Sequence, residues 1–79
     1  MKVKMMYFAS IRESVGISQE VLETKSTNAD QLLHEIVEKY NLALSLEHIK
    51  IAINEEYVAF NTLLNEGDTV VLIPPVAGG

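Results

Sequence analysis

The chain contains no cysteine and no tryptophan. Without cysteine it has no disulfide, no thiolate metal site and no cysteine nucleophile, and it cannot carry sulfur as a cysteine persulfide. No apolar run approaches the roughly 20 residues that a membrane-spanning helix needs. The apolar stretch after Lys2 and Lys4 is also too short for the central region of a secretory signal. We therefore expect a cytoplasmic protein that does not associate with a membrane.

Basic residues are scarce as well. Six Lys and Arg stand against eleven Asp and Glu, which gives a net charge of −5. Nucleic-acid binding requires clustered basic side chains, so we expect no nucleic-acid partner. A single domain of 79 residues buries only about 60–65% of the surface that its unfolded form exposes. Little room remains for both a core and a deep substrate pocket, which favours a binding module or carrier over a free-standing enzyme.

Alternation of apolar and polar residues predicts several strands. In the first, Val3, Met5 and Tyr7 alternate with Lys2 and Lys4, which places the apolar set inward. The register of the second strand is left open by its weak pattern. The further expected elements are an irregular connection at 10–18, strands at 19–24, 49–53, 57–60 and 69–73, and turns at 54–56 and 65–68.

One helix of about three turns is predicted from Asn28 to Tyr40. Thr27 is the expected N-cap, Asp30 favours the positive end of the helix, and Asn41 is the expected C-cap. The order β-β-α-β-β-β predicts an α+β fold in which this helix packs on one face of a mixed sheet of about five strands. The apolar stripe of the helix consists of Ala29, Leu32, Leu33, Ile36, Val37 and Tyr40.

The ending Pro74-Pro75-Val76-Ala77-Gly78-Gly79 is the most informative motif. The prolines stop the preceding strand and favour an extended, stiff geometry. The glycines lack Cβ, so another protein can close tightly around them. At about 3.3 Å per residue the segment spans roughly 20 Å, enough to enter a partner's active site. We expect a domain at 1–73 followed by an extended, flexible tail at 74–79; a frayed terminus without function is the alternative.

The carboxylate of Gly79 is the expected reactive group. A carboxylate is a poor electrophile, but as an acyl-adenylate made from ATP it acquires a good leaving group. Sulfide or another nucleophile can then replace AMP. With sulfide the product is a thiocarboxylate, which is a sulfur donor that needs no cysteine. The same activated tail can in principle be joined to an amine instead.

No other residues form a recognisable catalytic or metal site. His34 and His48 have no companion at the spacing of metal ligands. The serines and Asp30 form no triad. We therefore expect no catalytic residue and no bound metal or cofactor in this chain, which suits a protein that is acted upon.

The order of elements and the ending resemble the ubiquitin-like β-grasp sulfur carriers, and within them the small, sulfur-carrying subunits of molybdopterin synthase. The resemblance covers the whole chain, and the ending is its specific part. Members of this family often carry an aromatic residue before Pro-Pro, where this chain has Ile73. Further residues that fit the family are Gly67-Asp68, Phe8-Ala9, Arg12-Glu13 and Ile53-Asn54.

The resemblance implies a sequence of partners. An ATP-dependent adenylating enzyme would activate Gly79, and a sulfur-donating enzyme would supply the sulfur for a thiocarboxylate. The tail 74–79 would then enter the active site of the large catalytic subunit of molybdopterin synthase, in a heterotetramer with one carrier at each end. There the sulfur would pass to the pyranopterin precursor of the molybdenum cofactor. The chain itself would be a non-catalytic subunit.

A docking patch is expected beside the tail, because the first and last strands of a β-grasp sheet are neighbours. If Val70 and Leu72 face the helix, the outward residues form one exposed apolar surface. A shifted register would instead place some of them in the core. The residues of this docking patch are Met6, Phe8, Val71 and Ile73.

Three other functions stay open at this point. A sulfur carrier for thiamine or another pathway shares Gly-Gly but usually lacks the preceding Pro-Pro. A ubiquitin-related protein modifier would be joined to lysines of its targets. A plain interaction module would make no use of Gly79.

Overall fold

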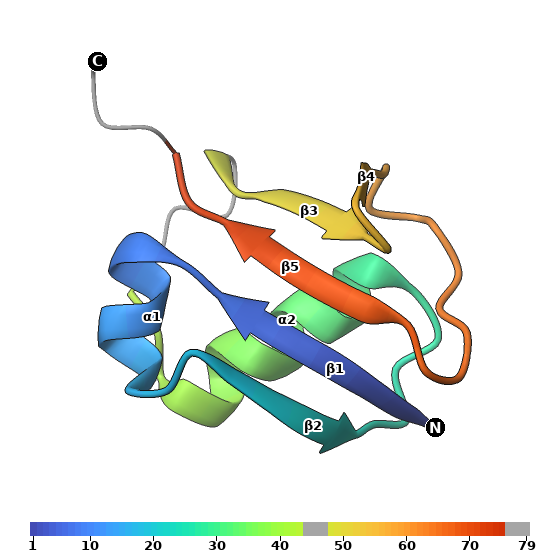
Figure 1. The fold of residues 1–79 in the computed structure, drawn as a ribbon, viewed down its shortest axis with the longest axis horizontal. Coiled ribbons are helices and arrows are strands. Elements are labelled where there is room, and N and C mark those ends of the chain that lie inside the picture. The colour runs from blue at the N-terminus through green and yellow to red at the C-terminus, as the bar shows by residue number, and fades with distance from the viewer. Residues whose placement is uncertain (44–47, 76–79) are drawn as a thin grey trace.

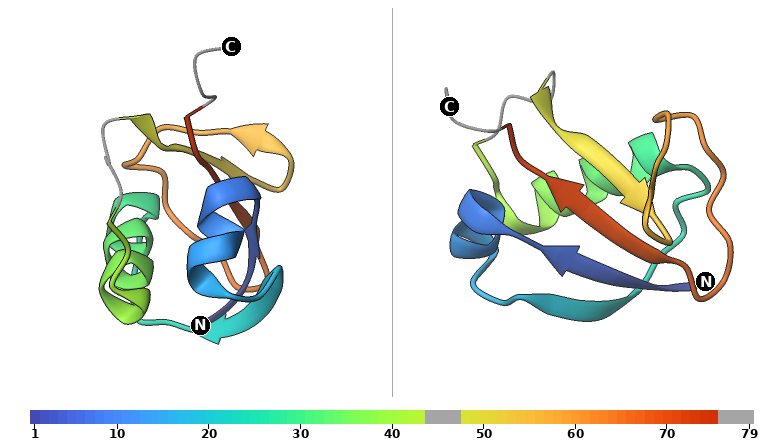
Figure 2. Two further views of the ribbon diagram at one scale, coloured as in Figure 1. Left: turned by 90° about the vertical axis from the view of Figure 1, so that its left-hand side faces the viewer. Right: turned by 45° about the horizontal axis from the view of Figure 1, so that its top comes forward.

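The computed structural model describes residues 1–43 and 48–75. Within these ranges a sheet and a helix form two layers, with α2 lying across one face of the sheet (Figure 1). Seen from other sides in Figure 2, α1 stands at the end of the sheet where β1 and β5 finish. The elements are β1 (Lys2–Tyr7), α1 (Ala9–Val15), β2 (Gln19–Glu23), α2 (Ala29–Tyr40), β3 (Lys50–Ile53), β4 (Glu56–Tyr57) and β5 (Thr69–Ile73).

The sheet has five strands in the order β2-β1-β5-β3-β4. β1 and β5 are parallel, whereas the other neighbouring pairs are antiparallel. The last strand of the chain therefore lies in the middle of the sheet, directly beside the first. This confirms the expected adjacency of the two strands and the β-grasp architecture. The open register of β2 is fixed by the pairing of Val3 with Leu22 and of Met5 with Glu20.

The core lies between the sheet and α2. Val3, Met5 and Tyr7 are at most 1% exposed, which confirms the inward set of β1. Val70 and Leu72 of β5 are fully buried, so the expected register of this strand is also confirmed. The helix contributes the buried side chains Ala29, Leu32, Leu33 and Ile36, with Val37 and Tyr40 packed at the margin.

The N-cap of α2 is Asn28, so the prediction of Thr27 was wrong by one residue. Asn28 Oδ1 accepts a hydrogen bond from the Gln31 backbone N–H at 2.9 Å. The Gln31 side chain in turn accepts from the N–H and the hydroxyl of Thr27, at 2.8 and 3.0 Å. Thr27 is therefore held by the first helical turn instead of capping it. At the other end, Asn41 is confirmed as the C-cap, with a left-handed φ of 51°.

The segment expected to be an irregular connection at 10–18 contains α1, so that prediction was wrong. Ile11 is fully buried and Val15 is half-buried four residues later, so both lie on the helix face that packs on the core. Gly16 ends the helix with a left-handed φ of 94°, which a residue with a Cβ adopts only with strain. The glycine that indicated a loop is thus the stop signal of a short helix.

β4 is shorter than the expected strand at 57–60. Asn54 and Glu55 both have positive φ, 52° and 72°, which is typical of a two-residue hairpin turn. The Val58 N–H still donates to the Ile51 carbonyl at 3.1 Å, and the chain then leaves the sheet and runs to the start of α2. There the carbonyl of Phe60 accepts from the Asp30 N–H at 2.8 Å, as part of the capping of the helix. The Phe60 carbonyl is therefore hydrogen-bonded to the first turn of a helix and not to a neighbouring strand.

Candidate functional site

The root of the tail is the end of β5. This strand is held on both sides, because Leu72 pairs with Tyr7 of β1 and with Ile51 of β3. Ile73 closes the strand, and Pro74 is half-buried while Pro75 is exposed. The tail therefore starts at a fixed point. The predictions for Val76, Ala77, Gly78 and Gly79 lie outside the described residues.

The start of β5 is fixed by a buried carboxylate. Asp68 Oδ1 accepts from Asn54 Nδ2 at 2.9 Å, and Asp68 Oδ2 accepts from the Asn65 N–H at 2.8 Å. The amide oxygen of Asn54 accepts from the Thr69 N–H at 3.0 Å. Gly67 provides the expected turn with a φ of 82°. Because these hydrogen bonds join the two turns, the start of β5 has a defined position.

The docking patch lies on the sheet face opposite α2. Met6 pairs directly with Val71. Phe8 and Ile73 each follow a residue of the Tyr7–Leu72 pair, so they lie at the end of the sheet from which the tail leaves. Phe8 is 45% exposed, whereas the other three side chains are half-buried. Phe8 is thus the most exposed of the four side chains; the role of the docking patch stays a prediction.

The structure extends this surface by residues that the sequence did not place there. Val71 pairs with Ala52 of β3, and Ala52 pairs with Tyr57 of β4, which is 70% exposed. Lys50 lies opposite Ile73, and its Nζ is 5.7 Å from the centre of the Tyr57 ring. Ala52 pairs with Tyr57 because the turn between their strands has two residues, Asn54 and Glu55. The length of this turn is the sequence feature from which the position of Tyr57 could have been predicted.

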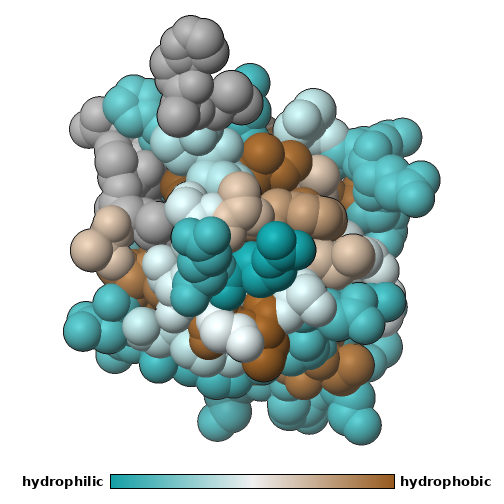
Figure 3. Space-filling view, turned by 60° about the vertical axis from the view of Figure 1, so that its left-hand side comes forward, coloured by the Kyte–Doolittle hydropathy of each residue, from teal (hydrophilic) through white to brown (hydrophobic). Residues whose placement is uncertain are grey.

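Apolar side chains also reach the surface elsewhere. Figure 3, which brings forward the side where α1 lies, shows them as separate patches between polar groups. Two other apolar residues are each 70% exposed without belonging to the docking patch: Val21, which lies opposite Lys4 on the same sheet face, and Leu63 before β5. Exposed apolar residues alone therefore do not define the site, and the tail root is what singles out one surface.

A second polar cluster joins β2 to β1 and α2. The hydroxyls of Tyr7 and Tyr40 each donate to Glu20 Oε2 at 2.6 Å, and Lys39 Nζ donates to Glu20 Oε1 at 3.3 Å. The two rings meet edge to face with centroids 6.3 Å apart. Burial and the hydrogen bond to Glu20 raise the pKa of Tyr7 above its ordinary value of 10.0. The polar groups of this cluster are hydrogen-bonded to one another, so we interpret the cluster as structural.

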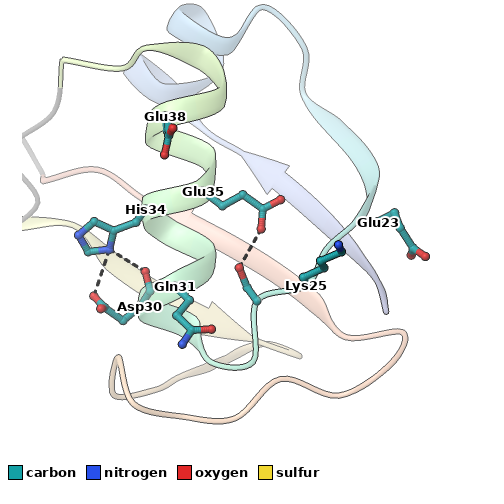
Figure 4. A pocket seen from close by; sticks show the side chains of 8 residues that line it. Glu23, Lys25, Asp30, Gln31, His34, Glu35 and Glu38 are labelled. Carbon is teal, nitrogen blue, oxygen red and sulfur yellow. Dashed lines mark hydrogen bonds and ion pairs between the residues drawn. The ribbon is translucent and has the colours of Figure 1, made fainter.

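An open groove of about 800 Å³ runs along α2. Figure 4 shows that two of its acidic side chains, Asp30 and Glu35, interact with neighbouring groups. Glu35 accepts from the hydroxyls of Ser26, at 2.8 Å, and Thr24. His34 Nδ1 lies 2.8 Å from the Asp30 carbonyl oxygen. In the part of the chain that the structure describes, no three such side chains are arranged to hold a metal ion, and no helix there is long and apolar enough to cross a membrane.

Comparisons with known proteins identify the family of this chain. The model of the ThiS family matches residues 5–79. A molybdopterin synthase sulfur carrier subunit of Escherichia coli is 34% identical to this chain, over 98% of this chain and 99% of its own. Small archaeal modifier protein 1 of Methanosarcina acetivorans has a TM-score of 0.79 at 25% identity, covering 99% of this chain and 96% of its own.

A solved complex is similar as well. The protein–protein complex of subunits 1 and 2 of molybdopterin-converting factor from Helicobacter pylori contains a chain with a TM-score of 0.70 and 28% identity, with both chains covered completely. The family match, the full-length relatives and the structural similarity all indicate the same family. This chain belongs to the ThiS family and has the ubiquitin-like β-grasp fold of the sulfur carriers, with molybdopterin synthase sulfur carrier subunits among its full-length relatives.

Proposed function

We propose that this chain is a sulfur carrier of molybdenum cofactor biosynthesis and that Gly79 carries the sulfur. The observation that carries the proposal is the position of β5, a central strand anchored at both ends that leads directly into Pro74-Pro75. A slim segment that starts from such a fixed root can be delivered into a partner in one orientation. The full-length similarity to molybdopterin synthase sulfur carrier subunits supports the pathway.

The chemistry proceeds in two steps at the carboxyl group of Gly79. In the activating enzyme a carboxylate oxygen attacks the α-phosphorus of ATP, and pyrophosphate leaves. Sulfide (HS⁻) delivered by a sulfur-donating enzyme then attacks the carbonyl carbon of the adenylate, AMP leaves with the bonding electrons, and the S–H proton is released to solvent. The product is a thiocarboxylate. This chain supplies the acyl group and the shape of the tail, and its partners supply the catalytic groups.

The acceptor in this proposal is the large catalytic subunit of molybdopterin synthase. The docking patch rests on that subunit, and the tail reaches into its active site, where the sulfur passes to the pyranopterin precursor. Six residues from Pro74 to Gly79 span roughly 20 Å, which suffices for an active site below the surface. The similarity to a chain of the Helicobacter pylori complex supports a two-subunit assembly, and we propose a heterotetramer with two carriers.

The test is mass spectrometry of the intact chain after incubation with the activating enzyme, ATP and a sulfur source. We expect the mass to rise by the difference between one sulfur and one oxygen. Deletion of Gly79 should abolish both this change and sulfur transfer, while the melting curve stays the same. Val21→Thr, a change at an exposed position of β2, should load normally. Normal loading of the chain that lacks Gly79 would contradict the proposal.

A protein modifier is the second candidate, because a solved structural relative is named a small archaeal modifier protein. The same incubation separates the two. A modifier appears as larger covalent adducts on a denaturing gel after addition of cell extract, and a carrier appears as the sulfur-shifted free chain. Co-purification of a catalytic subunit for pterin sulfuration distinguishes this pathway from thiamine synthesis.

A further inference from the structure

The outer face of the sheet has a charge opposite to that of the whole chain. Among the described residues, the outward strand positions hold three lysines and one glutamate, a balance of +2, whereas the chain has a net charge of −5. The difference leaves −7 for the rest of the chain. Glu23 lies opposite Lys2 and offsets it. The uncompensated positive charge therefore belongs to Lys4 and Lys50.

A negative balance lies on the other side of the molecule. There α2 carries three acids, Asp30, Glu35 and Glu38, against one base, Lys39, a balance of −2, and the three acids line the groove (Figure 4). The protein is thus electrically asymmetric, with an acidic helix side and a basic sheet side. Such an asymmetry orients a molecule during its encounter with a charged partner.

Lys50 has a special position on the basic side. It pairs with Ile73 at the end of β5, whereas Lys4 pairs with Thr69 at the beginning of that strand. Lys50 is therefore the outward lysine beside the tail root. Its ammonium group lies over the exposed ring of Tyr57, with 5.7 Å between Nζ and the ring centre. A cation–π contact of this kind holds the charge at the surface and next to the docking patch.

We infer that the partner that accepts the tail approaches the outer sheet face under the guidance of its positive charge and presents a carboxylate to Lys50. This inference rests on the proposed function, because it takes the tail-accepting subunit as the partner. When that subunit covers the docking patch, Lys50 loses water, and an ammonium group without an acceptor is unfavourable. The phosphates of ATP are not the expected partner of the Lys50 ammonium group. They react with the Gly79 carboxylate, at the far end of a tail that spans roughly 20 Å, whereas Lys50 lies at its root.

Two charge reversals with the same effect on net charge test the inference. Lys50→Glu places the reversal beside the tail root, and Lys25→Glu places it on the exposed loop at the acidic groove. Lys50→Gln removes the charge without reversal. Association rate and Kd with the large catalytic subunit are measured by surface plasmon resonance at about 0.01 M and about 1 M salt, where the Debye length is about 30 Å and about 3 Å.

At low salt we expect Lys50→Glu to bind about tenfold or more weakly, mainly through slower association, and Lys50→Gln to fall between it and the wild type. Lys25→Glu should stay within about twofold of the wild type. The differences in association rate should shrink at high salt. An equal effect of both reversals would overturn the inference and leave the proposed function intact. No binding of the folded wild type would contradict both.

Discussion

Glu20 connects β2 to both β1 and α2 through the hydroxyls of Tyr7 and Tyr40. Burial acts to raise the pKa of Glu20, but the hydrogen bonds from Tyr40, Tyr7 and Lys39 outweigh it and hold the pKa below its ordinary value of 4.5. An acid with a lowered pKa in the folded state stabilises the fold while it is ionised. This stabilisation is present above the unfolded pKa and is lost as the pH falls through the folded pKa.

We therefore predict that Glu20→Gln lowers the free energy of unfolding by about 1–3 kcal/mol at pH 7, because two tyrosine hydroxyls lose an ionised acceptor. The difference from the wild type should narrow as the pH falls below 4.5, the ordinary pKa of the side chain. Urea unfolding at several pH values measures both effects. Glu38→Gln, at an exposed position of α2, is the control and should change little. A constant difference across this pH range would show that the ionised form has no special role.

Several single residues were predictable from the sequence and others were not. The positive φ of Asn41 and Gly67 could be predicted, because few residue types adopt positive φ and these two stand at a helix end and in a turn. The cap of α2 was misplaced, because Thr27 and Asn28 are both good capping residues and only the Gln31 side chain decides between them. Tyr57 was not assigned to the outer surface, because its neighbours depend on a turn of two residues.

At the scale of elements, α1 joins the core to the docking patch. Its N-cap is Phe8, which has extended backbone angles, φ −128° and ψ 156°, and makes no side-chain cap. Aspartate is among the preferred residues at such a position. Phe8→Asp can therefore remove the projecting ring without weakening the start of the helix, so it is well suited to test the patch.

We predict that Phe8→Asp weakens binding to the large catalytic subunit by about tenfold or more, because a central aromatic contact is replaced by a charge that must lose water. Isothermal titration calorimetry measures the affinity, and thermal unfolding checks the fold. Leu63→Asp, also an exchange of an exposed apolar residue for an acid, should bind like the wild type. If Phe8→Asp is folded and binds equally well, Phe8 does not belong to the docking patch.

The strands of the core were predictable because a period of two residues separates their buried and exposed sides, as in β1 and β5. The short elements were not. α1 has one fully buried residue, Ile11, which is too little for a visible helical period. β4 consists of two residues, because the following carbonyls serve α2. Both outcomes depend on tertiary contacts that a local pattern does not contain.

For the whole molecule, the proposed function requires that the carboxylate stand at the very end of the tail. We predict that two alanines added after Gly79 abolish sulfur loading, because they move the acid group by roughly 7 Å and put a bulkier residue in its place. The same two residues added before Met1 should leave loading unchanged, since β1 begins at the end of the sheet away from the tail root (Figure 1). Mass spectrometry reads out both variants, and full loading of an uncleaved C-terminal extension would contradict the proposal.

The parallel pairing of β1 with β5 also has a mechanical consequence. The chain enters the sheet at one end and leaves it at the other, so a force between residue 1 and the tail pulls these two strands in opposite directions along their length. Their connecting hydrogen bonds are then loaded in shear and resist together, whereas a hairpin opened from its end yields one bond at a time. A pull between the two ends of the chain is thus resisted by the whole β1–β5 ladder at once, even though the fold is small.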